Sequence, residues 1–225
     1  MFAHVPNALT GLRLLLAFVF FTLLSFYQYE GRGYPTLLNT AFVIYIVALI
    51  TDFLDGYLAR RWHVEGTFGR IVDPFVDKVL VLGSFAFFAG KNFIIPDPEF
   101  PGPHMVVKTI SGVTPAMVVI LLARELLVTS LRGEAESTGY NFGAEWSGKI
   151  KMVIQSATIL IILVYVNYLP WLDARHYEPA ARRTRDAFIY LTLIVTVLSG
   201  LAYIRTATRL YRGKGIKDHS ETTST

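Results

Sequence analysis

Six long apolar segments constrain the fold of this chain more than any other feature of its sequence. They span approximately residues 9–27, 37–58, 74–95, 113–132, 150–170 and 186–205. A helix needs about 20 residues to cross the hydrocarbon core of a bilayer, and each segment reaches or approaches that length. Hydrophobic residues make up 53% of the chain and charged residues only 17%, which is more apolar than an ordinary soluble domain. The sequence therefore predicts an all-α, polytopic integral membrane protein with about six transmembrane helices.

Proline, glycine and polar residues mark the boundaries between these segments. A Pro-rich loop at 96–103 follows the third segment, and the region 169–185, with Pro170 and Pro179, separates the fifth from the sixth. We expect residues 1–212 to form one transmembrane domain and residues 213–225 to form a polar, frayed tail. The N-terminus lacks the basic start and small-residue cleavage site of a signal peptide, so the first segment is expected to remain as a helix.

The distribution of Lys and Arg predicts the orientation in the membrane. Six helices place both termini on one side, and basic residues are more numerous on that side. Since basic residues concentrate on the cytoplasmic side of membrane proteins, we expect cytoplasmic termini. An arginine-rich run at 175–185 falls on the opposite side. It is consistent with an amphipathic stretch that touches anionic head groups, although a solvated loop is the favoured interpretation.

Four aspartates lie at the expected cytoplasmic ends of the second and third segments: Asp52, Asp55, Asp73 and Asp77. A carboxylate at membrane depth is costly, so ion or substrate handling is the default hypothesis. Each pair is about one helical turn apart, and two facing helices with two carboxylates each can form an all-oxygen cage. Mg²⁺ and Mn²⁺ prefer such ligands, whereas a thiolate zinc site is excluded because the chain has no cysteine. For Asp73 alone, a helix N-cap before Pro74 is a competing interpretation.

Small and basic residues accompany this aspartate pattern. Gly56 and Ala59 lack bulk on the carboxylate-bearing face of the second segment, as a ligand close to the backbone would require. Gly69 helps to make the link between the two segments pliable. Arg60 and Arg61 add positive charge, so the expected cavity suits phosphate or pyrophosphate. Taken singly, the arginines are also consistent with interfacial anchors, and Gly56 with helix packing.

The combined pattern resembles a known signature. It reads Asp52-x2-Asp55-Gly56-x2-Ala59-Arg60-x8-Gly69-x3-Asp73-x3-Asp77, and it is similar at every fixed position to the motif of the CDP-alcohol phosphatidyltransferase family. Residues 5–13, 123–132 and 148–151 resemble the bacterial phosphatidylglycerophosphate synthase branch of that family. The resemblance covers nearly the whole chain. It implies transfer of the phosphatidyl group from CDP-diacylglycerol to sn-glycerol 3-phosphate, with release of CMP, by a homodimer in the bacterial cytoplasmic membrane that binds no nucleic acid.

The resemblance also implies roles for particular residues. The four aspartates would hold Mg²⁺ or Mn²⁺, as two ions, and Asp77 would act as general base. The residues assigned to CDP-diacylglycerol are Asn7, Thr10, Arg13, Gly56, Ala59, Arg60 and Gly69. For Asn7 and Thr10, a cap at the start of the first helix is an equal alternative. No serine, cysteine or histidine is placed as an obvious covalent nucleophile, which favours direct displacement.

A phosphorylated acceptor needs cations besides the metals. Glu125, Thr129 and Arg132 follow the i, i+4, i+7 spacing of one helix face in the fourth segment. The candidates for binding the acceptor phosphate are Arg124, Arg132, Lys149 and Lys151. Competing interpretations are a buried ion pair between Arg124 and Glu125, and lysines that only extend toward the membrane interface.

Two other functions remain open at this stage. The aspartate motif defines the donor chemistry and leaves the acceptor open, so another alcohol such as inositol phosphate or serine is an alternative. A divalent-cation transporter could also place carboxylates among helices, but it has no need of the small residues and arginine beside them.

Overall fold

A computed structural model of the protein describes residues 5–31, 33–62, 67–96, 107–137 and 146–222, and most of their side chains. Within these ranges the chain forms six α-helices. They are α1 (Val5–Phe26), α2 (Pro35–Trp62), α3 (Thr67–Phe88), α4 (Pro115–Ser137), α5 (Trp146–Ala174) and α6 (Glu178–Thr222). Each of the six predicted apolar segments corresponds to one helix, so the predicted fold class, an all-α polytopic membrane protein, is confirmed.

Four helices in the described ranges are long and apolar enough to cross a membrane. Their apolar stretches are Ala8–Phe26, Pro35–Asp55, Gly148–Ala174 and Glu178–Thr208. The other two long helices are less apolar because they carry charged residues along the same length. These include Asp77 and Lys78 in α3 and Arg124, Glu125 and Arg132 in α4. Three of these charged residues, Asp77, Arg124 and Arg132, are ones that the sequence assigned to chemistry.

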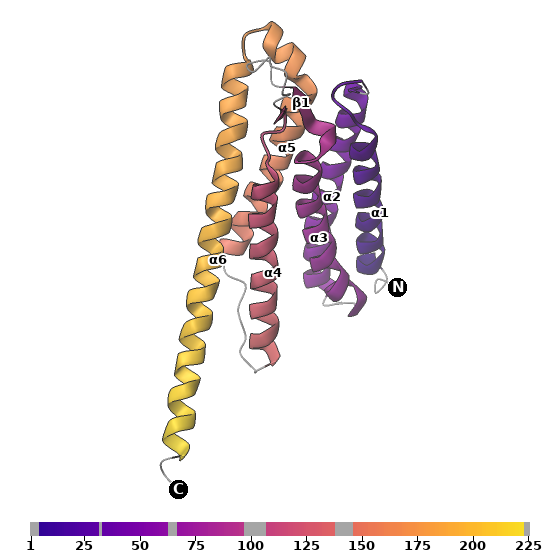
Figure 1. The fold of residues 1–225 in the computed structure, drawn as a ribbon. Helices are drawn as coiled ribbons and strands as arrows, with labels where there is room; N and C mark the ends of the chain where they lie inside the picture. The colour runs from indigo at the N-terminus through magenta and orange to yellow at the C-terminus, as the bar shows by residue number, and fades with distance from the viewer. Residues whose placement is uncertain (1–4, 32, 63–66, 97–106, 138–145, 223–225) are drawn as a thin grey trace.

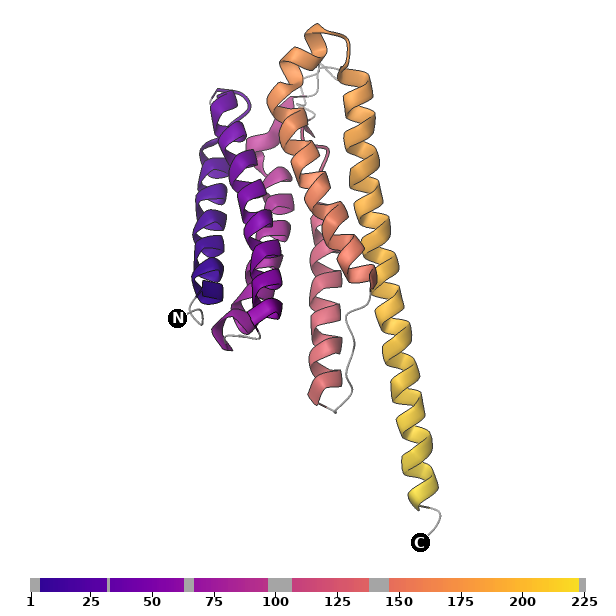
Figure 2. The ribbon, with the colours of Figure 1, turned by 180° about the vertical axis from the view of Figure 1, so that it is seen from behind.

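The helices form an elongated bundle (Figure 1). Helix α1 packs against α2 and α3, α2 and α3 also contact α5, and α6 packs against both α5 and α4. Both termini lie toward one end of the bundle, and the turn between α5 and α6 lies at the other (Figures 1 and 2). Aromatic side chains fill much of the core. The rings of Phe20 and Tyr45 have centroids 5.4 Å apart, and those of Phe88 and Phe93 meet edge to face at 5.3 Å.

A short strand pair follows α3, in a region that the sequence predicted as irregular loop. A 3₁₀ turn, η1 (Lys91–Phe93), leads into β1 (Ile94–Pro96), which pairs antiparallel with β2 (Val107–Thr109). The rest of the Pro-rich loop lies outside the described residues. Arg185 of α6 holds the chain just after β2, because its Nη1 donates a 2.6 Å hydrogen bond to the carbonyl oxygen of Ile110. Gly112 makes room for this guanidinium at a φ of +76°, where a Cβ would lie 2.9 Å from Nε of Arg185.

Three expectations about the helix ends are wrong. Helix α3 begins at Thr67 rather than near 74, so Asp73 lies inside the helix and is not its N-cap. The solvated loop expected at 175–185 is mostly the first turns of α6, which starts at Glu178, and Arg185 is buried. The tail expected to fray continues α6 to Thr222. In each case hydropathy placed the boundary where charge begins, whereas a helix continues through charged residues that have good helix propensity.

Candidate active site

Three aspartates converge on one arginine at the end of the bundle where the chain begins. Nη1 of Arg13, on α1, lies 2.9 Å from Oδ1 of Asp52 on α2 and 3.0 Å from Oδ1 of Asp77 on α3. Its Nη2 lies 3.7 Å from Oδ2 of Asp55. We call Asp52, Asp55 and Asp77 the carboxylate cluster. The sequence predicted that these residues meet, and the structure brings them together.

Burial within the carboxylate cluster is graded. The side chains of Arg13 and Asp55 are 1% and 5% exposed, whereas those of Asp77 and Asp52 are 25% and 37% exposed. The cluster therefore has a closed inner side and opens past Asp52 and Asp77. The hydroxyl of Thr10 is buried 3.5 Å from Asp55 on the inner side. Since α1 begins at Val5, Thr10 is in its second turn and does not cap the helix.

The carboxylate cluster suits a cation in its chemistry. Its described oxygens already surround one positive group, the guanidinium of Arg13, and carboxylate oxygens are ligands of hard divalent ions. No set of three metal-ligating side chains is arranged as an ion cage among the described residues. The side chain of the fourth predicted ligand, Asp73, is not among those that the structure describes.

Several other predicted residues can be placed only by their backbone. Asn7 is in the first turn of α1, Gly56, Ala59 and Arg60 are in the last part of α2, and Gly69 and Asp73 are in the first turns of α3. All of these elements meet at the end of the bundle that holds the carboxylate cluster (Figure 1). Their side chains are not among those described.

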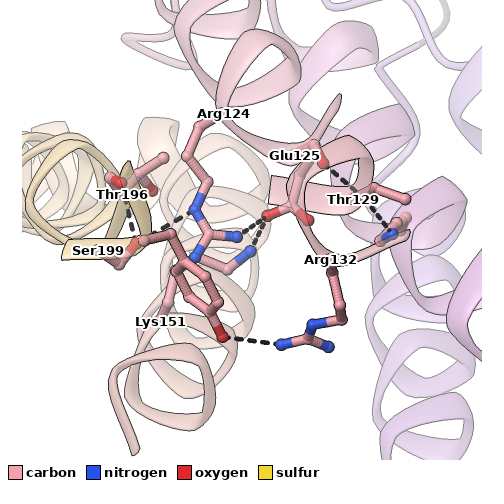
Figure 3. Close-up of polar contacts among 9 residues, drawn as sticks. Arg124, Glu125, Thr129, Arg132, Lys151, Thr196 and Ser199 are labelled. Carbon is pink, nitrogen blue, oxygen red and sulfur yellow. Dashed lines mark hydrogen bonds and ion pairs between the residues drawn. The ribbon is translucent and has the colours of Figure 1, made fainter. Parts of the chain in front are cut away.

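A second polar cluster is centred on Glu125 of α4 (Figure 3). Nη1 of Arg124 donates to Oε1 of Glu125 at 2.9 Å, and the ammonium of Lys151 on α5 donates to the same oxygen. Nε of Arg124 also donates to the hydroxyl of Ser199 on α6 at 3.2 Å. Arg124, Glu125 and Lys151 are all buried. The ion pair considered from the sequence is therefore present, and Lys151 does not extend toward the interface.

Two more basic residues join this cluster. Nζ of Lys78, on α3, donates a 2.7 Å hydrogen bond to the hydroxyl of Thr129. Nη2 of Arg132 donates a 2.7 Å hydrogen bond to the hydroxyl of Tyr203 on α6. Nε of Arg132 is buried and has no acceptor among the described atoms. An unmatched buried donor costs about 1–3 kcal/mol, so an incoming anion would be favoured there.

We call Lys78, Arg124, Arg132 and Lys151, together with Glu125, the cation cluster. Two of the four basic side chains contact the single carboxylate, so the cluster has an excess of positive charge. Helix α3 joins the cation cluster to the carboxylate cluster through consecutive residues: Asp77 contacts Arg13 and Lys78 contacts Thr129. Consecutive helix residues point about 100° apart, so one helix can present a residue to each cluster.

Sequence reasoning missed three residues of the cation cluster and its surroundings, and one residue that it proposed for this site, Lys149, stays a prediction. Lys149 is exposed near the start of α5. Lys78, Ser199 and Tyr203 were not identified. For the two α6 residues a signal existed, because buried polar residues recur there at helical spacing: Thr192, Thr196, Ser199 and Tyr203. Lys78 gave no such signal, since a single lysine beside an aspartate has many structural explanations.

Replacing Glu125 by glutamine tests the balance of charge in the cation cluster. The amide can still accept a hydrogen bond, but Arg124 and Lys151 would lose the negative charge that offsets their burial. We expect the free energy of unfolding to fall by about 2 kcal/mol. The measurement is chemical unfolding in mixed micelles. Glu178→Gln, at the opposite end of the bundle and partly exposed, is the matched control. Equal unfolding curves for the two variants would contradict this role of Glu125.

Comparison with known proteins adds to this geometry. The family model of CDP-alcohol phosphatidyltransferases matches residues 3–200. A CDP-diacylglycerol–glycerol-3-phosphate 3-phosphatidyltransferase of Haemophilus influenzae is 28% identical over 206 residues, which cover 91% of this chain and 93% of the relative. A Bacillus subtilis protein of the same name is 26% identical over 89% of this chain and 93% of the relative. A probable phosphatidylglycerophosphate synthase of Mycobacterium tuberculosis is 30% identical over 92% of this chain and 83% of the relative.

Proposed function

The chain belongs to the CDP-alcohol phosphatidyltransferase family, and from this premise we propose that it transfers the phosphatidyl group of CDP-diacylglycerol to sn-glycerol 3-phosphate. The products would be phosphatidylglycerophosphate and CMP. The names of the bacterial relatives support this acceptor. The membership also makes the protein a phosphatidyltransferase enzyme, as its sequence predicts.

The observation that carries the proposal is the adjacency of two clusters of opposite charge. Asp77 and Lys78 follow one another on α3. Asp77 belongs to the carboxylate cluster and Lys78 belongs to the cation cluster. The reaction joins a donor that carries a pyrophosphate to an acceptor that carries a phosphate. A centre for donor activation beside a separate anion site is the arrangement that such a transfer requires.

The proposed chemistry is a direct displacement at phosphorus. The primary hydroxyl oxygen of the acceptor forms a bond to the phosphorus that bears diacylglycerol, and the bond from this phosphorus to the CMP oxygen breaks. Asp77 accepts the hydroxyl proton as general base. Oδ1 of Asp77 also contacts the guanidinium of Arg13, so the proposed base is shared with an ion pair. Positioning of the two substrates must therefore supply much of the rate.

We propose that Asp52, Asp55, Asp73 and Asp77 hold Mg²⁺ or Mn²⁺, as two ions. When bound, the metal ions would neutralise charge that develops on the leaving CMP. The convergence of three described carboxylates on a positive group supports this assignment. The guanidinium of Arg13 contacts the same carboxylate oxygens and balances their charge, and we also assign it to the donor's phosphates.

The acceptor phosphate is assigned to the cation cluster. The buried Nε of Arg132, which has no described acceptor, supports Arg132 as its main ligand, and Arg124 and Lys151 provide further positive charge. Lys149 remains a predicted contributor that lies exposed near the start of α5. The donor is assigned to residues around the carboxylate cluster: Asn7, Thr10, Arg13, Gly56, Ala59, Arg60 and Gly69.

Location and assembly follow from the same proposal. The protein is a multi-pass membrane protein, and we place it in the bacterial cytoplasmic membrane with both termini and the site facing the cytoplasm. CDP-diacylglycerol keeps its acyl chains in the bilayer and its nucleotide at the surface, while glycerol 3-phosphate is water-soluble. A site at the cytoplasmic end can meet both. The transmembrane domain of residues 1–212 and the homodimer remain predictions.

The test is release of CMP by the purified protein in detergent with CDP-diacylglycerol and Mg²⁺. Separate reactions contain glycerol 3-phosphate, inositol phosphate, serine or no acceptor. We expect release only with glycerol 3-phosphate, because only that arm supplies the acceptor proposed for the cation cluster. Release with another alcohol would retain the family chemistry and overturn the acceptor. No release from folded protein would contradict the proposed activity and favour divalent-cation transport.

A further inference from the structure

Tyr203 of α6 contacts both arginines of the cation cluster. Its hydroxyl accepts the 2.7 Å hydrogen bond from Nη2 of Arg132. The centroid of its ring lies 5.6 Å from Cζ of Arg132 and 5.7 Å from Cζ of Arg124, within the range of a cation–π interaction. Tyr203 is only 1% exposed. One buried side chain therefore touches the two guanidinium groups that the proposed function assigns to the acceptor.

The neighbouring residues of α6 also hold Arg124. The hydroxyl of Ser199, one turn before Tyr203, accepts a hydrogen bond from Nε of Arg124. Gly200 allows the aliphatic part of the Arg124 side chain to pass close to the α6 backbone, since a Cβ at Gly200 would lie 3.2 Å from Cγ of Arg124. This face of α6 thus holds Arg124 at its stem and its guanidinium, and Arg132 at its guanidinium.

Such support matters for binding a phosphate. An arginine side chain has many rotamers, and a guanidinium binds phosphate best when its plane is held so that two N–H groups point at two oxygens. Two guanidinium groups in one partly buried cluster also repel each other. A tyrosine ring offers its negative face to the cations, and its hydroxyl fixes one Nη while other N–H groups stay available. Nε of Arg132 is buried and meets no acceptor among the described atoms.

We propose that Tyr203 is a positioning residue that sets the affinity for the acceptor phosphate by orienting Arg132 and Arg124. This inference rests on the proposed function, because it assumes that the cation cluster binds the acceptor. Tyr203 acts through the two arginines. It takes no part in the displacement at phosphorus.

The deciding variant is Tyr203→Phe, which removes the hydroxyl and keeps the ring. In steady-state assays with saturating CDP-diacylglycerol, we expect the KM for glycerol 3-phosphate to rise about tenfold through loss of the bond to Arg132. The kcat and the KM for CDP-diacylglycerol should stay within about twofold of the wild type, because the interaction affects acceptor binding alone. Tyr203→Leu, which also removes the ring, should raise the KM for glycerol 3-phosphate further. Tyr190→Phe, an exposed tyrosine of the same helix, is the matched control.

Three results would contradict the inference in distinguishable ways. An unchanged KM for glycerol 3-phosphate in Tyr203→Phe would show that the hydroxyl does not position the arginines. A fall of kcat together with a rise of both KM values and a lower melting temperature would indicate a purely structural role. If the wild type itself gave no turnover with glycerol 3-phosphate, the proposed acceptor would be wrong, and the inference would fail with it.

Discussion

Replacing Asp77 by asparagine is expected to lower the rate of CMP release about 10³-fold, because the amide cannot accept the proton of the acceptor hydroxyl. The amide has nearly the same size as the carboxylate, and Arg13 keeps its contacts with Asp52 and Asp55. The fold should therefore persist. The measurement is CMP release at saturating donor and acceptor, with thermal unfolding of the same preparation to confirm folding.

The matched control for this change is Asp173→Asn. Asp173 is an exposed carboxylate near the end of α5, at the opposite end of the bundle, so the same chemical change there should leave the rate unaltered. A rate for Asp77→Asn within tenfold of the wild type would remove Asp77 from the general-base role. The displacement would then proceed without proton transfer to Asp77.

The second large effect is expected for Arg13→Gln. Arg13 is buried and its guanidinium contacts the whole carboxylate cluster, so its loss leaves three neighbouring carboxylates without their main positive partner. Removing one member of a buried ion pair typically costs about 3–5 kcal/mol, and we expect a loss of stability in that range. The measurement is unfolding of the protein in micelles that contain a metal chelator.

Added Mg²⁺ distinguishes the role of the Arg13 guanidinium in the carboxylate cluster from that of a bound metal ion. If the aspartates bind metal, Mg²⁺ should raise the melting temperature of Arg13→Gln more than that of the wild type, because ligand binding stabilises the folded state. Arg183→Gln changes an exposed arginine at the far end of the bundle and is the control for loss of charge. An Arg13→Gln variant as stable as this control would refute the structural role. A variant that is destabilised but indifferent to Mg²⁺ would refute the metal assignment.

The sequence was sufficient to predict the helices and the shared face of Asp52 and Asp55, because both depend on local patterns. The meeting of these residues with Asp77 was predicted by assuming that their two helices face each other. An apolar run of about 20 residues indicates a membrane helix wherever it occurs, and carboxylates one turn apart share a face. Helix ends were predicted less well. Helix α3 includes Thr67 to Asp73, which the sequence assigned to a link and a cap, because hydropathy does not register a helix that begins before its apolar part.

Contacts between distant parts of the chain could not be predicted in this way. Arg13 meets Asp77 across 64 positions, and Arg132 meets Tyr203 across 71. Which helices are neighbours depends on the packing of the whole bundle, in which α4 lies against α6. A periodic pattern shows which face of a helix is polar and leaves open what that face contacts. The role of Tyr203 therefore emerges only from the three-dimensional arrangement.

The length of α6 has a practical consequence. Its 45 residues span about 67 Å at 1.5 Å per residue, roughly twice the 30 Å hydrocarbon core of a bilayer. Its C-terminal part extends well past the other helices (Figures 1 and 2). A fluorophore or affinity label fused after Thr222 would be carried at the end of this helix, beyond the other helices. Such a fusion can report on the enzyme or immobilise it on a support through a helix that extends past the rest of the bundle.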